Sequence, residues 1–413
     1  MNPFLPADIL LPQVKDLSQW AVIACDQFTS NPEYWARVRE YAGDSPSAIH
    51  LILPEVELGT DYEEAHMEEI RAAMVRYQQE HVFQSYNRSF VYVERTLMSG
   101  TVRKGLVGMV DLEAYDYSVG AVSAIRATEK TVVERIPPRM RVRRGAAVEL
   151  PHILMLADDH DKVLIEPIAA IKDTLPKLYD FELMEHGGRI CGWLVQGEIV
   201  DQFEERLAEY VERIGEKYEG LSGVPMVFAV GDGNHSLATA KACYEEWKAA
   251  NPDQDLSNHP ARFALVELEN IHDDAQVFEP IHRILAHTDP KKLLEDLKKS
   301  ACADGGFPVR WYTAEACGAV FLDRSKGQLP VGILQSFLDQ WMQTNEGEID
   351  YIHDDDELIS LASHPDSIGF LLPAMEKSQL FRGVIADGVL PRKTFSMGHA
   401  REKRYYLEGR TIR

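Results

Sequence analysis

The stretch VPMVFAVGDGNHSLATAKACYEEW, residues 224–247, predicts a buried strand, a short turn and an amphipathic helix in direct succession. Residues 227–230 are apolar enough for a central strand of a sheet. The apolar side chains that follow the turn recur at spacings of three and four, which predicts a helix that buries Leu237, Ala240, Cys243, Tyr244 and Trp247. Together with the strand and helix patterns that alternate after it, this stretch predicts an α/β or α+β fold with a mixed sheet and flanking helices.

The turn itself, GDGNHS, gathers polar side chains where the strand passes into the helix. Gly233 permits a positive φ and Asn234 can cap the helix, so an ordinary turn accounts for Asp232, Gly233 and Asn234. It does not require His235 beside them, nor Thr239 and Lys241 one turn further on. Because a helix N-terminus offers free N–H groups and the positive end of a dipole, the turn is a candidate anion site.

Other segments have equally clear periodicity. Apolar residues at helical spacing predict surface helices over 62–83 and 201–218. Alternation predicts strands over 88–97 and 105–115, a buried strand over 152–159 and a hairpin over 178–197. The segment EGLSGVP is the best linker, so we expect an α+β region over 1–220 and an α/β region over 221–413, or one continuous domain.

Composition excludes several classes of protein. The chain has 413 residues and a net charge of -23, which argues against a nucleic-acid partner. No apolar run approaches the roughly 20 residues that span a bilayer, and the first residues do not resemble a secretory signal. The five cysteines are scattered without a C-x-x-C pair, which predicts a reducing, cytoplasmic location. The composition is also compatible with a homo-oligomer.

The charge is unevenly distributed. Residues 126–144 contain seven Arg or Lys against two Glu, and residues 390–413 contain the same numbers. Two basic islands on an acidic body favour a small anionic metabolite or nucleotide as the partner. The alternative is that these cations pair with surface carboxylates.

The first island opens with the motif IRATEKT, whose candidate residues are Arg126, Glu129, Lys130 and Thr131. A glutamate among cations stays ionised, so Glu129 is a candidate base or metal ligand. The alternative is a charged strand end that Pro137 and Pro138 terminate.

Two further motifs are candidates for the same anion site. In VFEPIHRIL, Glu279, His282 and Arg283 are expected to open a helix, with Pro280 in its first turn. The tail motif LPRKTFSM contributes Lys393 and Thr394. The alternatives are a structural His–Arg pair and a basic C-terminal extension.

The order of these four motifs resembles a widespread bacterial family that is known as domain of unknown function 1015. The family's turn commonly reads Asp-Gly-His-His-Arg, which is similar to the turn of ParB-like free-serine kinases and of sulfiredoxin, where it grips phosphate at a helix start. Asp232 and His235 match that Asp and the second His. Asn234 and Ser236 replace the first His and the Arg, and Thr128 stands where the family commonly has a His before Glu129.

The resemblance implies a ParB- or sulfiredoxin-like core and a phosphotransferase that acts on a small hydroxyl- or amino-acid-type metabolite with Mg²⁺ and ATP or ADP. Asp232 would bind Mg²⁺ or orient the accepting hydroxyl, His235 would contact phosphate, and Glu129 would act as base or metal ligand. The expected substrate- or phosphate-binding residues are Arg126, Lys130, Thr131, Asn234, Ser236, His282, Arg283, Lys393 and Thr394. The alternatives are a non-catalytic nucleotide or phosphometabolite sensor and a metal-dependent hydrolase.

Overall fold

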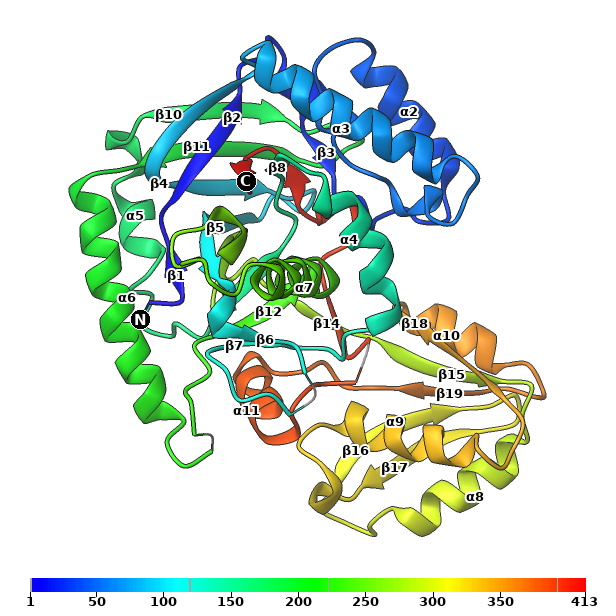
Figure 1. The fold of residues 1–413 in the computed structure, drawn as a ribbon. Helices are drawn as coiled ribbons and strands as arrows, with labels where there is room; N and C mark the ends of the chain where they lie inside the picture. Colours follow the sequence, from blue (N-terminus) through cyan, green and yellow to red (C-terminus); the bar gives the residue numbers. More distant parts are fainter. Residues whose placement is uncertain (1, 119, 222, 392) are drawn as a thin grey trace. The chain divides into compact units, whose positions relative to one another are not determined.

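The computed structural model describes residues 2–118, 120–221, 223–391 and 393–413 as two compact units (Figure 1). The first unit comprises Met1–Ala127, Thr131–Gln276 and His399–Arg413. The second unit comprises Thr128–Lys130 and Val277–Gly398. Each unit is described by itself below.

An 11-stranded mixed sheet forms the centre of the first unit, with the strand order β10-β11-β4-β5-β13-β9-β12-β7-β6 and with β1 and β2 paired to β5 and β4. The pairs β12–β7, β13–β9 and β6–β7 are parallel, whereas the other pairs are antiparallel. This confirms the predicted mixed α/β fold. The strands are β1 (Phe4–Leu5), β2 (Ala7–Pro12), β4 (Phe83–Thr96), β5 (Val102–Asp111), β6 (Tyr115–Asp116), β7 (Ile125–Ala127), β9 (Leu154–Ala157), β10 (Lys177–Glu182), β11 (Arg189–Val195), β12 (Phe228–Asp232) and β13 (Phe263–Asn270).

Helices surround this sheet, and the amphipathic ones lie where their periodicity predicted them. The long helix α6 buries one stripe of side chains at spacings of three and four, and its charged residues face outward. The helices are α1 (Leu17–Trp20), α2 (Pro32–Ala42), α3 (Glu63–Gln79), α4 (Ile136–Arg144), α5 (Glu166–Ala170), α6 (Glu198–Lys217) and α7 (Asn234–Ala250), with 3₁₀ turns at Ala48–His50, Glu55–Glu57, Leu112–Ala114, Val133–Arg135, Lys172–Thr174, Pro260–Arg262 and Ala400–Glu402.

The C-terminal residues return to the first unit and complete it. Tyr405–Tyr406 (β21) pairs with Val22–Ile23 (β3), and Arg410–Thr411 (β22) pairs with Val148–Glu149 (β8). In Figure 1 the red end of the chain lies beside β8. The final segment is therefore part of the folded unit rather than an extension.

The helix α7 follows β12 as predicted, but two details differ. Gly233, with φ of 77°, is the N-cap, and Asn234 is the first helical residue and does not cap the helix with its side chain. Trp247 is 40% exposed rather than buried, and Cys243 is only partly buried. The helix buries a narrower stripe than its apolar residues suggested, because its C-terminal end lies at the surface.

The second unit contains a five-stranded antiparallel sheet with the order β17-β16-β19-β15-β18, and a separate β14–β20 pair. Its strands are β14 (Phe278–Pro280), β15 (His282–Ala286), β16 (Phe307–Tyr312), β17 (Cys317–Leu322), β18 (Glu348–Ile352), β19 (Ile368–Leu371) and β20 (Phe395–Met397). Its helices are α8 (Pro290–Ser300), α9 (Pro330–Trp341), α10 (Asp355–Ala362) and α11 (Lys377–Asp387), with a 3₁₀ turn at Arg324–Lys326.

The predicted helix at VFEPIHRIL is wrong, because this segment forms strands β14 and β15. The strand β15 pairs with strands on both sides, and its first four residues are all buried. A strand that is covered on both faces lacks the alternation that marks a half-exposed strand, so its pattern does not distinguish it from a helix that begins at Pro280. Similarly, Pro137 and Pro138 do not end a strand but lie in the first turn of α4.

The units divide the chain at places other than the expected boundary near residue 220. The large sheet continues across that position, since β12 and β13 pair with β9 and β5 from the first half of the chain. The expected linker also contains Ser222, which lies outside the described residues. Within the described ranges, no helix combines the length and the apolar character that crossing a membrane requires.

Buried ion pairs join the C-terminal segment to the large sheet. The Nε atom of Arg404 lies 2.7 Å from a carboxylate oxygen of Glu267, and Arg404 also pairs with Glu408. Beside them Arg103 pairs with Glu269 at 3.0 Å. All five side chains are 4% exposed or less, so each charge depends on its partner for compensation.

Replacement of Arg404 by Met is expected to lower the free energy of unfolding by about 3–5 kcal/mol, because two carboxylates would stay buried without their cation. Urea denaturation followed by circular dichroism would measure the loss. Arg144→Met removes an exposed ion pair with Glu246 and should cost less than about 1 kcal/mol. Equal losses in the two variants would contradict this interpretation.

Candidate functional site

The GDGNHS turn is held in one conformation by its glycine. At Gly233 a Cβ atom would lie 2.9 Å from the carbonyl oxygen of His152, and the φ of 77° is unfavourable for other residues. The carbonyl of Gly233 accepts hydrogen bonds from the N–H groups of Ser236 and Leu237, which start the helix. The side chains of the turn are thereby fixed at the N-terminus of α7.

Asp232 is held in its ionised form by a lysine from the C-terminal segment. The Nζ atom of Lys403 lies 3.0 Å from Oδ2 of Asp232, and the N–H of Gly233 donates to Oδ1. Burial alone would raise the pKa of Asp232, but Lys403 and this hydrogen bond outweigh it and lower the pKa below its usual value. Asp232 is therefore a carboxylate at neutral pH.

His235 is a neutral imidazole. Its Nε2 atom accepts a hydrogen bond of 3.2 Å from the N–H of Val132. Burial, together with the positive charges of Arg139 and Arg135, lowers the pKa of His235 to about 4. Since Nε2 is an acceptor, the neutral ring carries its proton on Nδ1 and can donate it in a hydrogen bond.

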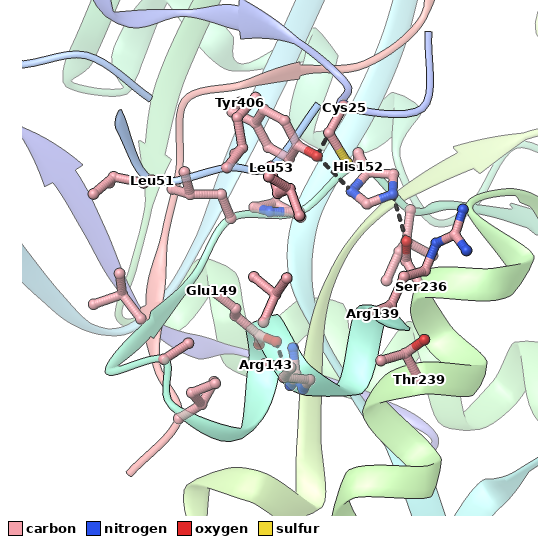
Figure 2. A pocket seen from close by; sticks show the side chains of 18 of the residues that line it. Cys25, Leu51, Leu53, Arg139, Arg143, Glu149, His152, Ser236, Thr239 and Tyr406 are labelled. Carbon is pink, nitrogen blue, oxygen red and sulfur yellow. Dashed lines mark hydrogen bonds and ion pairs between the residues drawn. The ribbon is translucent and has the colours of Figure 1, made fainter. Parts of the chain in front are cut away.

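A chain of hydrogen bonds leads from the turn to the C-terminal segment (Figure 2). Ser236 Oγ bonds His152 Nε2, and His152 Nδ1 lies 3.0 Å from the hydroxyl of Tyr406, which accepts the N–H of Cys25. Burial lowers the pKa of His152, and burial with the neighbouring Asp26 raises the pKa of Cys25 to about 12. The chain is therefore uncharged at neutral pH.

Seven cations of the two basic islands are engaged in ion pairs. The arginines of α4 bind carboxylates of four different segments, and those of the C-terminal segment bind carboxylates of the large sheet and of the segments beside it. The pairs are Arg139–Glu55, Arg141–Glu63, Arg143–Glu149, Arg144–Glu246, Lys403–Asp232, Arg404–Glu267 and Arg410–Glu149. The alternative reading of the islands, in which cations pair with carboxylates of the protein, accounts for these residues.

Arg126 does not point to the turn. It lies on β7 opposite Ala229 of β12, and its guanidinium donates to the carbonyls of Ser123 and Val224, each at 2.9 Å. Val224 precedes β12, whereas Asp232 ends it, so these bonds lie at the opposite end of the strand pair. The guanidinium of Arg126 thus bonds backbone carbonyls at the end of β12 away from Asp232, and its role in ligand binding stays a prediction.

Two of the expected binding residues of the first unit have buried polar atoms with no hydrogen-bond partner among the described residues. These atoms are Oγ1 of Thr131 and Oδ1 of Asn234. Thr131 directly precedes Val132, whose N–H reaches His235. Both residues are therefore placed beside the turn, with hydrogen-bonding capacity to spare.

In the second unit, three expected residues come together. Oε1 of Glu129 accepts the backbone N–H of Lys393 at 3.0 Å, and Nη1 of Arg283 donates to the Lys393 carbonyl at 2.8 Å. Arg283 is fully buried and also donates to Gln335. The side chains of Lys130 and Lys393 are exposed.

The remaining expected residues of the second unit serve its local structure. His282 is buried, with Nε2 2.7 Å from Asp355 and Nδ1 accepting the N–H of Leu372. Thr394 donates to the carbonyl of Pro391. Arg392 of the same motif lies outside the described residues.

Sequence reasoning missed Lys403, His152, Tyr406 and Asp26. Asp26 acts electrostatically on Cys25, His152 and His235, and it lies in the segment WAVIACDQFTSNPEYW near the start of the chain. No local pattern marks the other three residues, because their partners are distant in sequence. In the part of the chain that the structure describes, no three His, Cys, Asp or Glu residues gather as a metal-binding group.

Three solved structures illustrate the similarity to other proteins. SbnI from Staphylococcus aureus, truncated at its C-terminus, aligns with a TM-score of 0.36 and 9% identity over 71% of this chain and 83% of that chain. A free serine kinase in complex with AMP aligns with a TM-score of 0.35 and 9% identity over 74% and 91%. A conserved hypothetical protein from Pyrococcus furiosus aligns with a TM-score of 0.33 and 10% identity over 72% and 92%.

Comparison with curated proteins gives no match. The family comparison is decisive: the sequence model of the family described as "Protein of unknown function (DUF1015)" matches residues 5–396. The match contains the IRATEKT, GDGNHS and EPIHR motifs, and also the segment WAVIACDQFTSNPEYW with Asp26. This chain belongs to the DUF1015 family.

Proposed function

We propose that the first unit carries a phosphotransferase site that transfers a phosphoryl group from ATP or ADP to a hydroxyl of a small metabolite. The observation behind the proposal is the Asp232–Lys403 ion pair at the N-terminus of α7. Phosphoryl transfer needs a carboxylate that accepts or orients the hydroxyl proton and positive charge for the phosphoryl oxygens. The ion pair offers both in one place.

Asp232 would accept the proton of the attacking hydroxyl. The P–O bond to the leaving nucleotide breaks while the hydroxyl oxygen bonds to phosphorus, and the hydroxyl proton passes to Asp232. Lys403 and the dipole of the 17-residue helix α7 would stabilise the negative charge on the transferred group. Lys403 contacts Oδ2 of Asp232 and the N–H of Gly233 contacts Oδ1, so each oxygen keeps a further lone pair for this task.

The other residues of the turn would position the ligand. His235 would donate from Nδ1 to a phosphoryl oxygen as a neutral group rather than as a cation. Asn234 and Thr131 would use their buried oxygens for hydrogen bonds to the ligand. These roles draw on residues of the first unit, and Glu129, Arg283 and Lys393 contact one another within the second unit.

Mg²⁺ fits this site as an ion that arrives with the nucleotide. Magnesium in phosphoryl-transfer enzymes is commonly bound by one or two carboxylates together with substrate phosphates and water. Asp232 supplies one such carboxylate. When bound, the ion would neutralise charge on the phosphoryl oxygens.

We expect purified protein with ATP or ADP and Mg²⁺ to phosphorylate at least one member of a panel of hydroxylated amino acids and alcohols, as followed by ³¹P NMR. Asp232→Asn should lower kcat by about 10²–10⁴-fold, because it removes the proton acceptor. Asp255→Asn, at an exposed turn of the same unit, should leave kcat unchanged.

Two outcomes separate the alternatives. A thermal shift with nucleotide but no turnover in the wild-type protein would indicate a sensor rather than an enzyme. Absence of both turnover and thermal shift with any nucleotide or phosphorylated amino acid would overturn the phosphotransferase proposal.

The imidazole of His235 should titrate near pH 4, well below the usual value of about 6.5. Its folded-state pKa is lowered, so the stability that it contributes is present above pH 6.5 and is lost as the pH falls towards 4. Histidine-selective NMR on the wild-type protein and on His235→Gln would assign the resonance. A midpoint near 6.5 would show that His235 is exposed to solvent and would remove its role as a neutral donor.

A further inference from the structure

A cavity of about 160 Å³ lies beside the GDGNHS turn within the first unit (Figure 2). One part of its wall is apolar and comes from the segment before α3, from α3 itself and from the segment after α4. The apolar residues include Leu51, Leu53, Leu58, Met74, Ala146 and Leu150. The other part is polar and comes from Cys25, His152, Ser236, Thr239 and Tyr406.

The cavity presents no uncompensated charge among its described lining residues. Its two arginines are paired, Arg139 with Glu55 and Arg143 with Glu149. The imidazole of His152 is neutral, for the reason given above. A charged ligand group would therefore find no opposite charge here and would lose its hydration, so the cavity favours an uncharged group.

The polar end suits a hydroxyl group. Ser236 Oγ and His152 Nε2 share one hydrogen bond, and the Tyr406 hydroxyl on the other ring nitrogen can donate or accept. When Nε2 of His152 carries the proton, it donates to Ser236, whose own hydroxyl proton stays available for a ligand. When Nδ1 carries the proton, Ser236 donates to Nε2, and its oxygen stays available to accept from a ligand. A ligand hydroxyl, which is both donor and acceptor, can pair with either arrangement.

The size of the cavity limits the ligand. A dry protein cavity of about 150 Å³ accommodates benzene, so this cavity has room for an apolar group of about six carbon atoms. A long acyl chain would extend beyond the cavity. A fully polar molecule such as glycerol would leave the apolar wall without a partner.

We propose that the cavity binds the compact apolar group of an uncharged alcohol, branched aliphatic or aromatic, whose hydroxyl bonds Ser236. Ser236 lies four residues after Asp232 on the same turn, and His152 and Asp232 influence each other electrostatically. An uncharged alcohol of this kind is therefore the class of molecule that would accept the phosphoryl group at the site. This last statement rests on the proposed function, whereas the binding itself does not.

The test uses ligand-observed NMR on the wild-type protein with three probes, benzyl alcohol, toluene and glycerol. Benzyl alcohol should bind several-fold more tightly than toluene, and glycerol should not bind at the same concentration. Ser236→Ala should abolish the advantage of benzyl alcohol over toluene while toluene binding is kept. Equal binding of glycerol and benzyl alcohol, or no binding of benzyl alcohol at millimolar concentration, would overturn the proposal.

A second variant fills the cavity. Ala146→Leu places three more carbon atoms against the apolar wall and should weaken benzyl alcohol binding at least tenfold. Ala72→Leu makes the same change at an exposed position of α3 and should leave binding unaltered. If Ala146→Leu does not fold, Leu53→Phe serves the same purpose; unchanged binding in the folded variant would contradict the assignment.

The binding assay needs no nucleotide, so the two proposals can fail separately. Benzyl alcohol binding without phosphorylation of any alcohol would leave the cavity assignment intact and remove the phosphotransferase function. Phosphorylation of polar acceptors without benzyl alcohol binding would support the phosphotransferase function and remove the cavity assignment.

Discussion

The C-terminal segment His399–Arg413 is the constraint on which the first unit depends, because it carries the cations that buried carboxylates require. Arg404 compensates Glu267 inside the large sheet, and Lys403 compensates Asp232 at the end of β12. Without these cations the carboxylates would have to be protonated or hydrated, since an isolated buried charge is costly. Pairing of β21 and β22 with strands from earlier in the chain holds the segment in register.

The same segment sets the protonation states of the candidate site. Lys403 keeps Asp232 ionised, and Tyr406, three residues later, fixes His152 and through it Ser236. Ion pairing and hydrogen bonding therefore come from one short piece of chain. The carboxylate of Asp232 and the uncharged His152–Ser236 pair can lie close together because each has its own partner, Lys403 and Tyr406 respectively. Neither group therefore has to take up or release a proton to compensate the other.

The local part of this arrangement could be predicted from the sequence, and the non-local part could not. The strand, the Gly233 turn and α7 follow from periodicity and from a glycine whose conformation and surroundings suit no other residue. The contacts of Lys403, His152 and Tyr406 have no local signal, because they join segments up to 381 residues apart. The bonds of Arg126 have no local signal either: composition reveals its charge but not that its guanidinium donates to backbone carbonyls.

The pairing of Lys403 and Arg139 bears on the kind of ligand that the site can hold. Lys403 is balanced by Asp232 and Arg139 by Glu55, and both neighbouring histidines are neutral. Such a site carries little net charge, and the dipole of α7 contributes only about half a unit of positive charge. A nucleotide with several negative charges would therefore depend on the Mg²⁺ that it brings, whereas an uncharged alcohol enters the adjoining cavity without such a requirement. The balance of charge thus favours a site that binds a metal-bound nucleotide beside a neutral acceptor over a site that binds anions without a metal ion.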